Sequence, residues 1–340
     1  MNKESKKPDI KPHEVLHVLG LLLARMLNPH RRRFRDHWSR HGVGAVARGT
    51  FNEWMSRNRF EHVMANLHFT NNADVRASTD RAWKLRSVVD ILQKTFPRGY
   101  KTPPVISFDE GIIPTKNRKN PTRQYLKAKP HKWGTKVFLT CCADKAYCMR
   151  LEVYCGAAQH TAEVGNVPTS QLSADPNTGP SAVIRNLEAV LPPSVEKVFH
   201  LVVTDRFYTS VQLAFPLLHR NVYSIGTIQG DKLGYPQKIV EKIDRPKRTP
   251  HDTVRKAVAK NCPGMTGLVW WDRKPVPFLG TGSNQDMETC STYLKIVLAF
   301  LKLTIYFTCQ SDEHATTEVG STSFRVQQWL ETTIVGWEEL

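Results

Sequence analysis

The chain has 340 residues, 40% of them hydrophobic, which is enough to bury a core in one large domain accompanied by a smaller one. Lys and Arg number 48 against 31 Asp and Glu, which gives a formal net charge of +17. This excess favours a polyanionic partner, and DNA, RNA or an acidic membrane surface would satisfy it. No glycine-rich phosphate loop, HExxH motif or internal repeat is found, which excludes several common enzyme classes.

Membrane binding is the weakest of these alternatives. The N-terminal MNKESKKPDIKPHE is polar and lacks the apolar stretch of a signal peptide. Residues 293–307 are apolar, but the segment is too short for a spanning helix and carries Lys295 and Lys302. We interpret it as an amphipathic or buried helix and expect no membrane partner. Seven irregularly spaced cysteines indicate a reducing compartment and predict packing residues, since the zinc-type Cys-x-x-Cys spacing is absent.

Residues 11 to 96 have a mainly helical pattern. In the second helix of this region, Thr50 and Glu53 have the spacing of a capping box. Its large apolar residues recur near helical spacing and are predicted to lie in the core: Phe51, Trp54, Met55, Phe60 and Val63. Between the first two helices lies HRRRFRDHW, at residues 30–38. It is either a solvated charged face or a DNA contact, with Phe34 and Trp38 beside the basic residues.

After a polar linker, NNADVRASTDRA, a helix is predicted near residues 83–95, and the pattern then changes to strands. VISFD is a short apolar run, residues 133–156 predict two strands joined by a turn, and VEKVFHLVVTD predicts a buried strand. Helices are expected around residues 184–190 and within TSVQLAFPLLHRN, and VYSIGTI predicts another strand. This order predicts an α/β fold with a mixed sheet flanked by helices and a helical N-terminal region.

Two aspartates each follow an apolar run that is predicted to be a strand: Asp109 in PPVISFDEG and Asp205 in VFHLVVTDRFYTS. Two-metal nucleases hold divalent ions with carboxylates from separate strands, so these residues are candidate metal ligands. The alternative is that each aspartate caps a turn at the end of its strand. Glu110 would point to the opposite face of its strand, which predicts a peripheral or surface position.

Between the two aspartates, KNRKNPTRQYLKAKPHKWGTK contains no acidic residue. We predict salt-sensitive, largely sequence-independent phosphate contacts from its cations Lys116, Arg118, Lys119, Arg123, Lys127, Lys129, Lys132 and Lys136. We predict the same kind of phosphate contacts from residues 245–260, RPKRTPHDTVRKAVAK. Within the first segment, Tyr125 and Trp133 either stack on an unpaired base or pack against the protein.

The run from SFDEG to VYCG resembles the core of piggyBac-type transposases. It carries an aspartate–glutamate pair, a basic arginine–tyrosine stretch, the segment KPHKWGTK and a strand ending in YCG. VVTDRFYTSVQLAFPLLHRNVYSIGT is similar to the family's second aspartate block, and LVWWDRKPVPFLGTG to its tryptophan–aspartate segment. RNRFEHVMANLHF and DRAWKLRSVVDIL are similar to its helical N-terminal part. The matches cover roughly residues 11 to 285 in the expected order.

This resemblance implies an RNase H-like core of the DDE/DDD type, which cuts DNA by a divalent-metal mechanism and joins the freed 3′ hydroxyl to a target strand. It implies that Asp109 and Asp205 are the first and second metal carboxylates. Mg²⁺ or Mn²⁺ would be the cofactor of a catalytically competent protein. The implied partners are transposon ends and target DNA, and the implied assembly and location are a homodimer in the nucleus.

The sequence departs from the family pattern at three places. Arg206 follows the second aspartate, where the family usually has asparagine. The third catalytic acid has no convincing match: Asp272 lies where the family does not carry it, and no motif supports Asp286, Glu288, Asp312 or Glu313. The family pattern stops near Gly282, and its cysteine-rich zinc module is not recognised.

We therefore expect a helical region for DNA binding or dimerisation at residues 1–100, a transposase core with a basic insertion at 101–285, and a divergent tail at 286–340. The predicted function is that of a piggyBac transposable element-derived DNA-binding protein whose ancestral transposition activity is impaired or lost. The alternative is a non-catalytic, domesticated DNA-binding or chromatin-interaction protein, so enzymatic activity stays open at this point. An RNA-binding protein is a third alternative, without a supporting aromatic signature.

Overall fold

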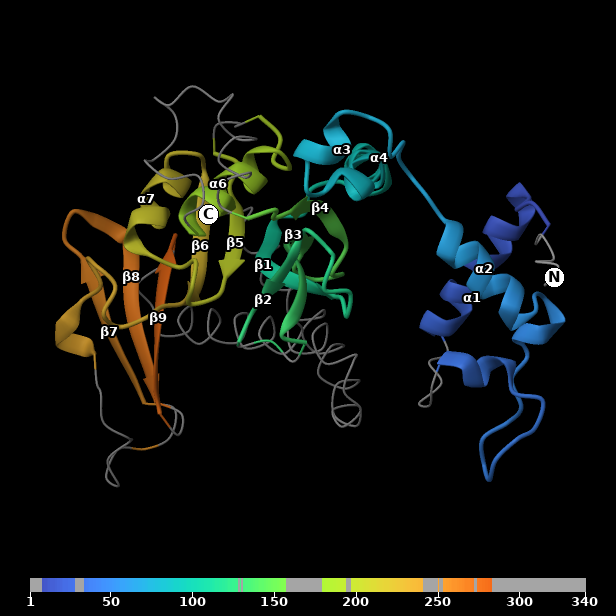
Figure 1. Cartoon of the computed structure of the whole chain (residues 1–340). Coiled ribbons are helices and arrows are strands. Elements are labelled where there is room, and N and C mark those ends of the chain that lie inside the picture. Colours follow the sequence, from blue (N-terminus) through green and yellow to red (C-terminus); the bar gives the residue numbers. More distant parts are fainter. Residues whose placement is uncertain are drawn as a thin grey trace. The chain divides into compact units, whose positions relative to one another are not determined.

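The computed structural model describes residues 8–27, 34–127, 129, 131–156, 179–193, 197–240, 250, 253–271 and 274–282. The chain divides into two compact units, Met1–Asn71 and Asn72–Leu340 (Figure 1). The predicted tail, the apolar segment 293–307 and five candidate acids lie outside the described ranges: Asp272, Asp286, Glu288, Asp312 and Glu313. Within those ranges, no helix is both long enough and apolar enough to cross a membrane.

The first unit packs two α-helices around an aromatic core. Helix α1 spans Pro12–Leu27 and α2 spans Arg57–Asn66, with the 3-10 helices η1 (Phe34–Trp38) and η2 (Phe51–Glu53) between them. The buried core consists of Val18, Leu21, Trp38, Phe51, Met55, Phe60 and Val63. Four of the five predicted core residues are therefore confirmed, whereas Trp54 is 66% exposed.

The start of α2 differs from the predicted capping box. Thr50 precedes η2 and makes no side-chain cap hydrogen bond. Instead, Ser56 caps α2, and its hydroxyl oxygen accepts a hydrogen bond from the Arg59 amide at 3.3 Å. The prediction was wrong because a short 3-10 helix separates Thr50 from the α-helix, and the local motif does not distinguish the two helix types.

Arg59 also connects α2 to α1. Its Nε and Nη2 atoms each donate to a Glu14 carboxylate oxygen at 2.7 Å, and Nη1 and Nη2 donate to the carbonyls of Pro8 and Asp9. The hydrogen bonds from Arg59 lower the pKa of Glu14 to about 2. One guanidinium thus fixes the start of α1 against the first turn of α2.

The described part of the second unit contains one nine-stranded mixed sheet. Its order is β2-β3-β1-β5-β6-β9-β8-β7, and β4 also pairs with β3. Strand β1 pairs in parallel with β5, which pairs in parallel with β6, and the remaining pairings are antiparallel. The strands are β1 (Val105–Pro114), β2 (Arg123–Tyr125), β3 (Trp133–Cys142), β4 (Cys148–Val153), β5 (His200–Thr204), β6 (Val222–Thr227), β7 (Val254–Ala259), β8 (Cys262–Trp271) and β9 (Pro275–Thr281).

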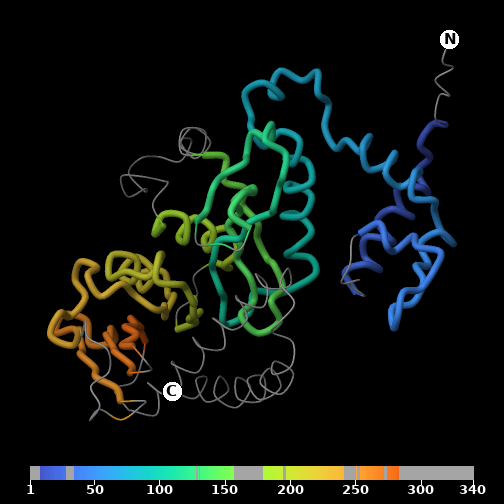
Figure 2. The backbone as a smooth tube through the Cα atoms, turned by 60° about the horizontal axis from the view of Figure 1, so that its bottom comes forward, coloured from blue at the N-terminus to red at the C-terminus, as the bar shows by residue number. Residues whose placement is uncertain are grey.

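Helices cover both faces of this sheet. Helices α6 (Gly179–Glu188) and α7 (Val211–Leu218) pack on the face that carries Phe108. Helix α4 (Trp83–Gly99) packs on the opposite face over β3 and β4, where Val89 joins a buried cluster, and Figure 2 shows it running beside these strands. The short helices α3 (Arg76–Thr79) and η3 (Gln237–Ile239) complete the unit.

The strands from VISFD to VYSIGTI and the helices α4, α6 and α7 are confirmed as element types. Strand β2 and strands β7 to β9 were not predicted. The compact units separate between Asn71 and Asn72, so α4, which the sequence analysis placed in the N-terminal region, belongs to the unit that contains the sheet.

Candidate functional site

The two predicted carboxylates lie next to each other on neighbouring parallel strands: Asp109 is in the middle of β1, which continues to Pro114, and Asp205 directly follows the last residue of β5. The last register pair of β1 and β5 is Phe108 with Thr204, and Asp109 and Asp205 are the next residue of each chain segment. Side chains alternate between the two faces along a strand, and these two parallel strands are in register. Both aspartates therefore project from the same face of the sheet as Val105 and Val203. The fold therefore brings together two acids that are far apart in the sequence.

Backbone amides already bind one oxygen of each carboxylate. Asp109 Oδ1 accepts a hydrogen bond from the Glu110 amide at 2.7 Å. Asp205 Oδ1 accepts from the amides of Phe207 and Tyr208 at 3.0 and 3.3 Å, so this aspartate does cap the turn after β5. Among the described residues, neither Oδ2 atom accepts a hydrogen bond, which leaves one oxygen of each acid for a ligand.

Burial and mutual repulsion disfavour ionisation of both aspartates. Burial raises the pKa of Asp109 from its ordinary 3.8 to about 7, nearby Lys129 opposes this shift, and Glu110 and Asp205 add to it. The pKa of Asp205 is raised as well, first by burial and then by Glu110. A cation that binds between or beside the two side chains would offset the unfavourable free energy of ionising them.

Glu110 is part of this region, although the sequence predicted a peripheral or surface position. Its side chain does leave the opposite face, but only 15% of it is exposed. The buried Tyr208 hydroxyl donates to Glu110 Oε2 at 2.5 Å, and Lys129 Nζ lies 3.4 Å from Oε1 while donating to the Glu110 carbonyl at 3.0 Å. The sequence analysis missed this cluster because its three members come from β1, a loop and the turn after β5.

The eight predicted phosphate-binding cations fall into two groups. Lys129 and Lys136 are partly buried beside the acids, and burial lowers the pKa of Lys136, whereas Glu110 raises it. Arg123 is partly buried against Trp133, with its guanidinium carbon 3.9 Å from the ring centroid. The remaining cations are exposed and free to meet a polyanion: Lys116, Arg118, Lys119, Lys127 and Lys132.

In the second basic segment, residues 241–249 and 251–252 lie outside the described ranges. Its described cations Arg255, Lys256 and Lys260 are exposed on or next to β7, the strand at the other edge of the sheet. The segment thus contributes positive charge at an edge remote in strand order from β2.

The two carboxylates form a donor set that suits a hard divalent cation. Asp109 and Asp205 offer carboxylate oxygens, which are the ligands that Mg²⁺ and Mn²⁺ prefer. Throughout the described ranges, no group of three or more His, Cys, Asp or Glu side chains is placed to hold a metal ion. None of the described cysteines forms a disulfide: Cys142 and Cys155 are buried, and Cys141, Cys148 and Cys262 are partly buried. The described residues thus supply two ligands and identify no third.

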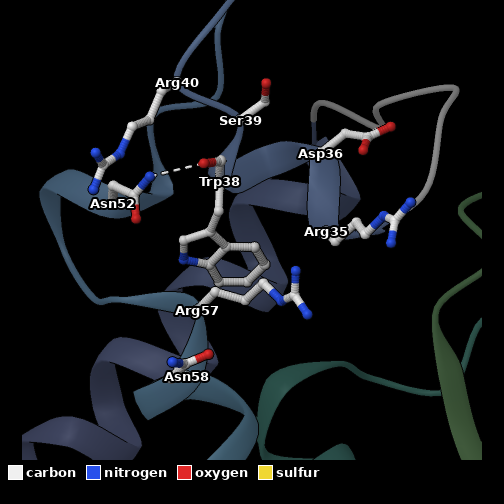
Figure 3. Close-up of a pocket in the computed structure, with 8 residues that line it drawn as sticks. All are labelled: Arg35, Asp36, Trp38, Ser39, Arg40, Asn52, Arg57 and Asn58. Carbon is white, nitrogen blue, oxygen red and sulfur yellow. Dashed lines mark hydrogen bonds between the residues drawn. The ribbon is translucent and has the colours of Figure 1, made fainter.

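The first unit carries an open, arginine-rich cleft of about 430 Å³ (Figure 3). Its lining includes Arg35, Asp36, Trp38, Ser39, Arg40, Asn52, Arg57 and Asn58. Trp38 is 7% exposed, donates from Nε1 to the Met55 carbonyl at 2.8 Å and packs against Phe34 in the core. The two aromatics beside the predicted basic loop are therefore packing residues, and residues 30–33 of that loop lie outside the described ranges.

Two comparisons with sequences place the chain among transposase-related proteins. Residues 1–296 match the family model described as Transposase IS4. Two human proteins, PiggyBac transposable element-derived protein 3 and the Chimeric ERCC6-PGBD3 protein, are each 26% identical to it over 181 residues. Each match covers 53% of this chain, but only 28% and 16% of the two relatives, so the chain matches less than a third of either protein's length.

A comparison with solved structures agrees with the sequence matches. The cryo-EM structure of the piggyBac transposase synaptic complex with hairpin DNA matches 95% of this chain and 65% of that chain, with a TM-score of 0.67 at 18% identity. At this identity the likeness shows the fold, and it confirms the predicted RNase H-like mixed sheet flanked by helices. Together with the family match over most of its length, this identifies the chain as a member of the transposase IS4 family, of the piggyBac type.

Proposed function

We propose that this chain is a piggyBac transposable element-derived protein that binds DNA and whose ancestral activity is metal-dependent DNA strand cleavage and transfer. The observation that carries the proposal is the side-by-side placement of Asp109, within β1, and Asp205, directly after β5. Transposon ends and target DNA are the proposed partners, and the nucleus is the proposed location. A homodimer is the proposed assembly, which sedimentation of the purified chain would test.

In this proposal each group of residues has its own task. Asp109 and Asp205 would hold Mg²⁺ or Mn²⁺, which when bound supplies Lewis-acid stabilisation of charge on phosphate oxygens. Tyr208 and Lys129 hold the Glu110 side chain and thereby fix the part of β1 that carries Asp109. The exposed cations between Lys116 and Lys132 bind backbone phosphates and supply affinity that salt weakens.

Lys129 favours a second candidate, a non-catalytic DNA-binding protein. Its ammonium group lies 3.4 Å from the Glu110 carboxylate and opposes the upward shift of the Asp109 pKa. A resident cation compensates part of the negative charge that would otherwise attract a divalent ion. With only two metal carboxylates in the described ranges, DNA binding would then persist without cleavage.

Nicking of supercoiled DNA in Mg²⁺ and in Mn²⁺ separates the two candidates. The variants are Asp109→Asn and Asp205→Asn, and Asp90→Asn on the exposed side of α4 is the matched control. The first candidate predicts nicking by the wild type and the control but not by the two site variants. Tight binding without nicking by any of the four supports the second candidate. Absence of DNA binding at low salt contradicts both.

A further inference from the structure

Two large aromatic rings remain exposed at the β2 edge of the sheet. Tyr125 on β2 and Trp133 on β3 are direct register partners, and their ring centroids are 4.9 Å apart with the planes inclined by 56°. Their exposed fractions are 51% and 45%, whereas the core rings Phe108 and Phe138 are at most 5% exposed. Packing alone therefore leaves much of both rings in water, at a cost that a stacked ligand would relieve.

Arg123 extends this aromatic pair with a planar cation. It lies two residues before Tyr125, on the same face of β2, and its guanidinium covers Trp133 at 3.9 Å. Within the described ranges its guanidinium forms no hydrogen bond and no ion pair, and its Nε atom is enclosed by the protein, so the donors left for a ligand are those of the two terminal nitrogens. A stacked guanidinium with unused donors matches the geometry of a phosphate group.

From these observations we propose that Arg123, Tyr125 and Trp133 form a binding site for one unpaired nucleotide of DNA, which we name the β2 stacking site. Bases stack on aromatic rings and on guanidinium planes, and the guanidinium donors would bind the adjoining phosphate. The base must be unpaired because both faces of a base inside a duplex are already covered by its neighbours. The inference rests on the proposed DNA-binding function and adds a ligand class to it.

The surrounding chain suits a single strand that approaches this site. Lys127 and Lys132 lie between the two rings in the sequence, in the loop that joins β2 to β3. The Leu126 amide donates to the Lys132 carbonyl at 2.8 Å and closes this loop. Both lysines are exposed and would neutralise phosphates on either side of the stacked base. Strand β3 separates β2 from β1, so the β2 stacking site is distinct from the carboxylate pair.

The test compares two labelled DNA duplexes of the same sequence. One is perfectly paired, and the other, the bulged duplex, carries one additional 2-aminopurine that has no base opposite it. Binding to the full chain is measured by fluorescence anisotropy. In Tyr125→Ala/Trp133→Ala, affinity for the bulged duplex should fall by roughly 5- to 150-fold, the range for loss of stacking on one base, while affinity for the perfect duplex stays unchanged. The wild type should quench 2-aminopurine fluorescence, and the double variant should not.

Three further variants keep the result interpretable if the double variant folds poorly. Trp133→Phe retains a planar ring and should keep most of the preference for the bulged duplex. Arg123→Lys retains the charge but not the planar donors, and should lose that preference. Trp54→Ala removes an indole of the first unit that is even more exposed than Trp133, and it should change neither affinity.

Other outcomes would overturn the inference. Equal affinity of the wild type for both duplexes, or equal losses on both in the double variant, contradicts an unpaired-nucleotide site while leaving the proposed DNA binding intact. A stronger preference for a matched RNA strand than for DNA contradicts the assignment of the ligand to DNA. Failure of the wild type to bind either duplex contradicts the proposed function itself, and the inference with it.

Discussion

The Tyr208 hydroxyl donates a 2.5 Å hydrogen bond to Glu110 Oε2 and so joins the turn after β5 to the middle of β1. Tyr208 is fully buried and its ring packs edge-on against Phe108 at 5.0 Å. The same turn is capped by Asp205, and Glu110 directly follows Asp109. This one bond therefore ties together the two chain segments that carry the candidate metal ligands.

Removal of this hydroxyl should destabilise the protein. We expect Tyr208→Phe to lower the free energy of unfolding by about 1.5–3 kcal/mol, because the donor serves a charged acceptor. The control is Tyr235→Phe, whose hydroxyl donates to the neutral carbonyls of Leu268 and Phe278 and should cost about 1 kcal/mol. Urea unfolding in EDTA measures both. A Tyr208→Phe cost no larger than that of Tyr235→Phe would contradict this role.

The pH dependence of stability should report on Asp109. Its pKa is about 7 in the folded chain against an ordinary 3.8, so the folded state binds the proton more tightly. The resulting stabilisation is fully present below about pH 4 and is lost as the pH rises through about 7. In EDTA, Asp109→Asn should therefore be more stable than the wild type by roughly 2–4 kcal/mol at about pH 8, and nearly equal to it at about pH 4. A difference that does not change with pH would refute this, and Asp90→Asn is the control.

Divalent cations should remove the same penalty. Mn²⁺ or Mg²⁺ that binds only the folded chain raises its melting temperature in proportion to the logarithm of ion concentration. We expect this rise in the wild type at about pH 8, and its loss in Asp109→Asn and in Asp205→Asn. Differential scanning fluorimetry over a series of Mn²⁺ and Mg²⁺ concentrations measures the effect. Matched series with Ca²⁺ and with a monovalent salt are the controls. An equal rise in all three proteins would mean that the ions bind elsewhere.

Salt dependence should distinguish the exposed cations from the partly buried ones. Replacing Lys116, Arg118 and Lys119 with Gln should reduce the slope of log affinity against log salt by up to about 0.9 for each phosphate that is no longer neutralised. The folded structure should not change, since these side chains are exposed. The matched control replaces Lys84, Lys94 and Arg98, which are exposed on α4. Equal reductions in both triple variants would show that general charge, and not this segment, governs binding.

The ion pair between Arg59 and Glu14 should stabilise the first unit. Arg59→Lys loses the paired donors to the carboxylate and the bonds to two carbonyls, so the melting temperature should fall. Arg57→Lys, which alters an exposed pair with Glu61 on the same helix, should have little effect. Because the pKa of Glu14 is lowered to about 2, its contribution is present above about pH 4.5 and is lost as the pH falls towards 2.

Much of the site could be predicted from the sequence because its signals are local. An apolar run followed by an acid identified Asp109 and Asp205, and alternation along a strand correctly placed Glu110 on the other face. Burial of Glu110 could not be predicted, since its partners Tyr208 and Lys129 reach it only through the tertiary fold. The parallel pairing of β1 with β5 is likewise a long-range property without a local pattern.

Charge runs proved less informative about individual residues. Eight cations between Lys116 and Lys136 look equivalent in the sequence, yet the antiparallel register that pairs Lys136 with Ile112 turns its side chain towards the acids. Strands β8 and β9 were missed because glycines and prolines interrupt residues 262–281, and β7 was missed because its residues were assigned to a basic phosphate-binding segment. Their pairing with one another provides the order that local propensity lacks.

The neighbouring positions of β1 and β5 also constrain how the chain must fold during synthesis. Strands β2, β3 and β4 and helix α6 all leave the ribosome between them, so the central parallel pair closes a long loop, and such pairings form slowly. Until β5 emerges, one side of β1 presents unpaired backbone groups next to Ile106 and Phe108, which are wholly buried in the finished fold. Until β5 is available, the nascent chain therefore exposes an unpaired strand edge of the kind that promotes self-association.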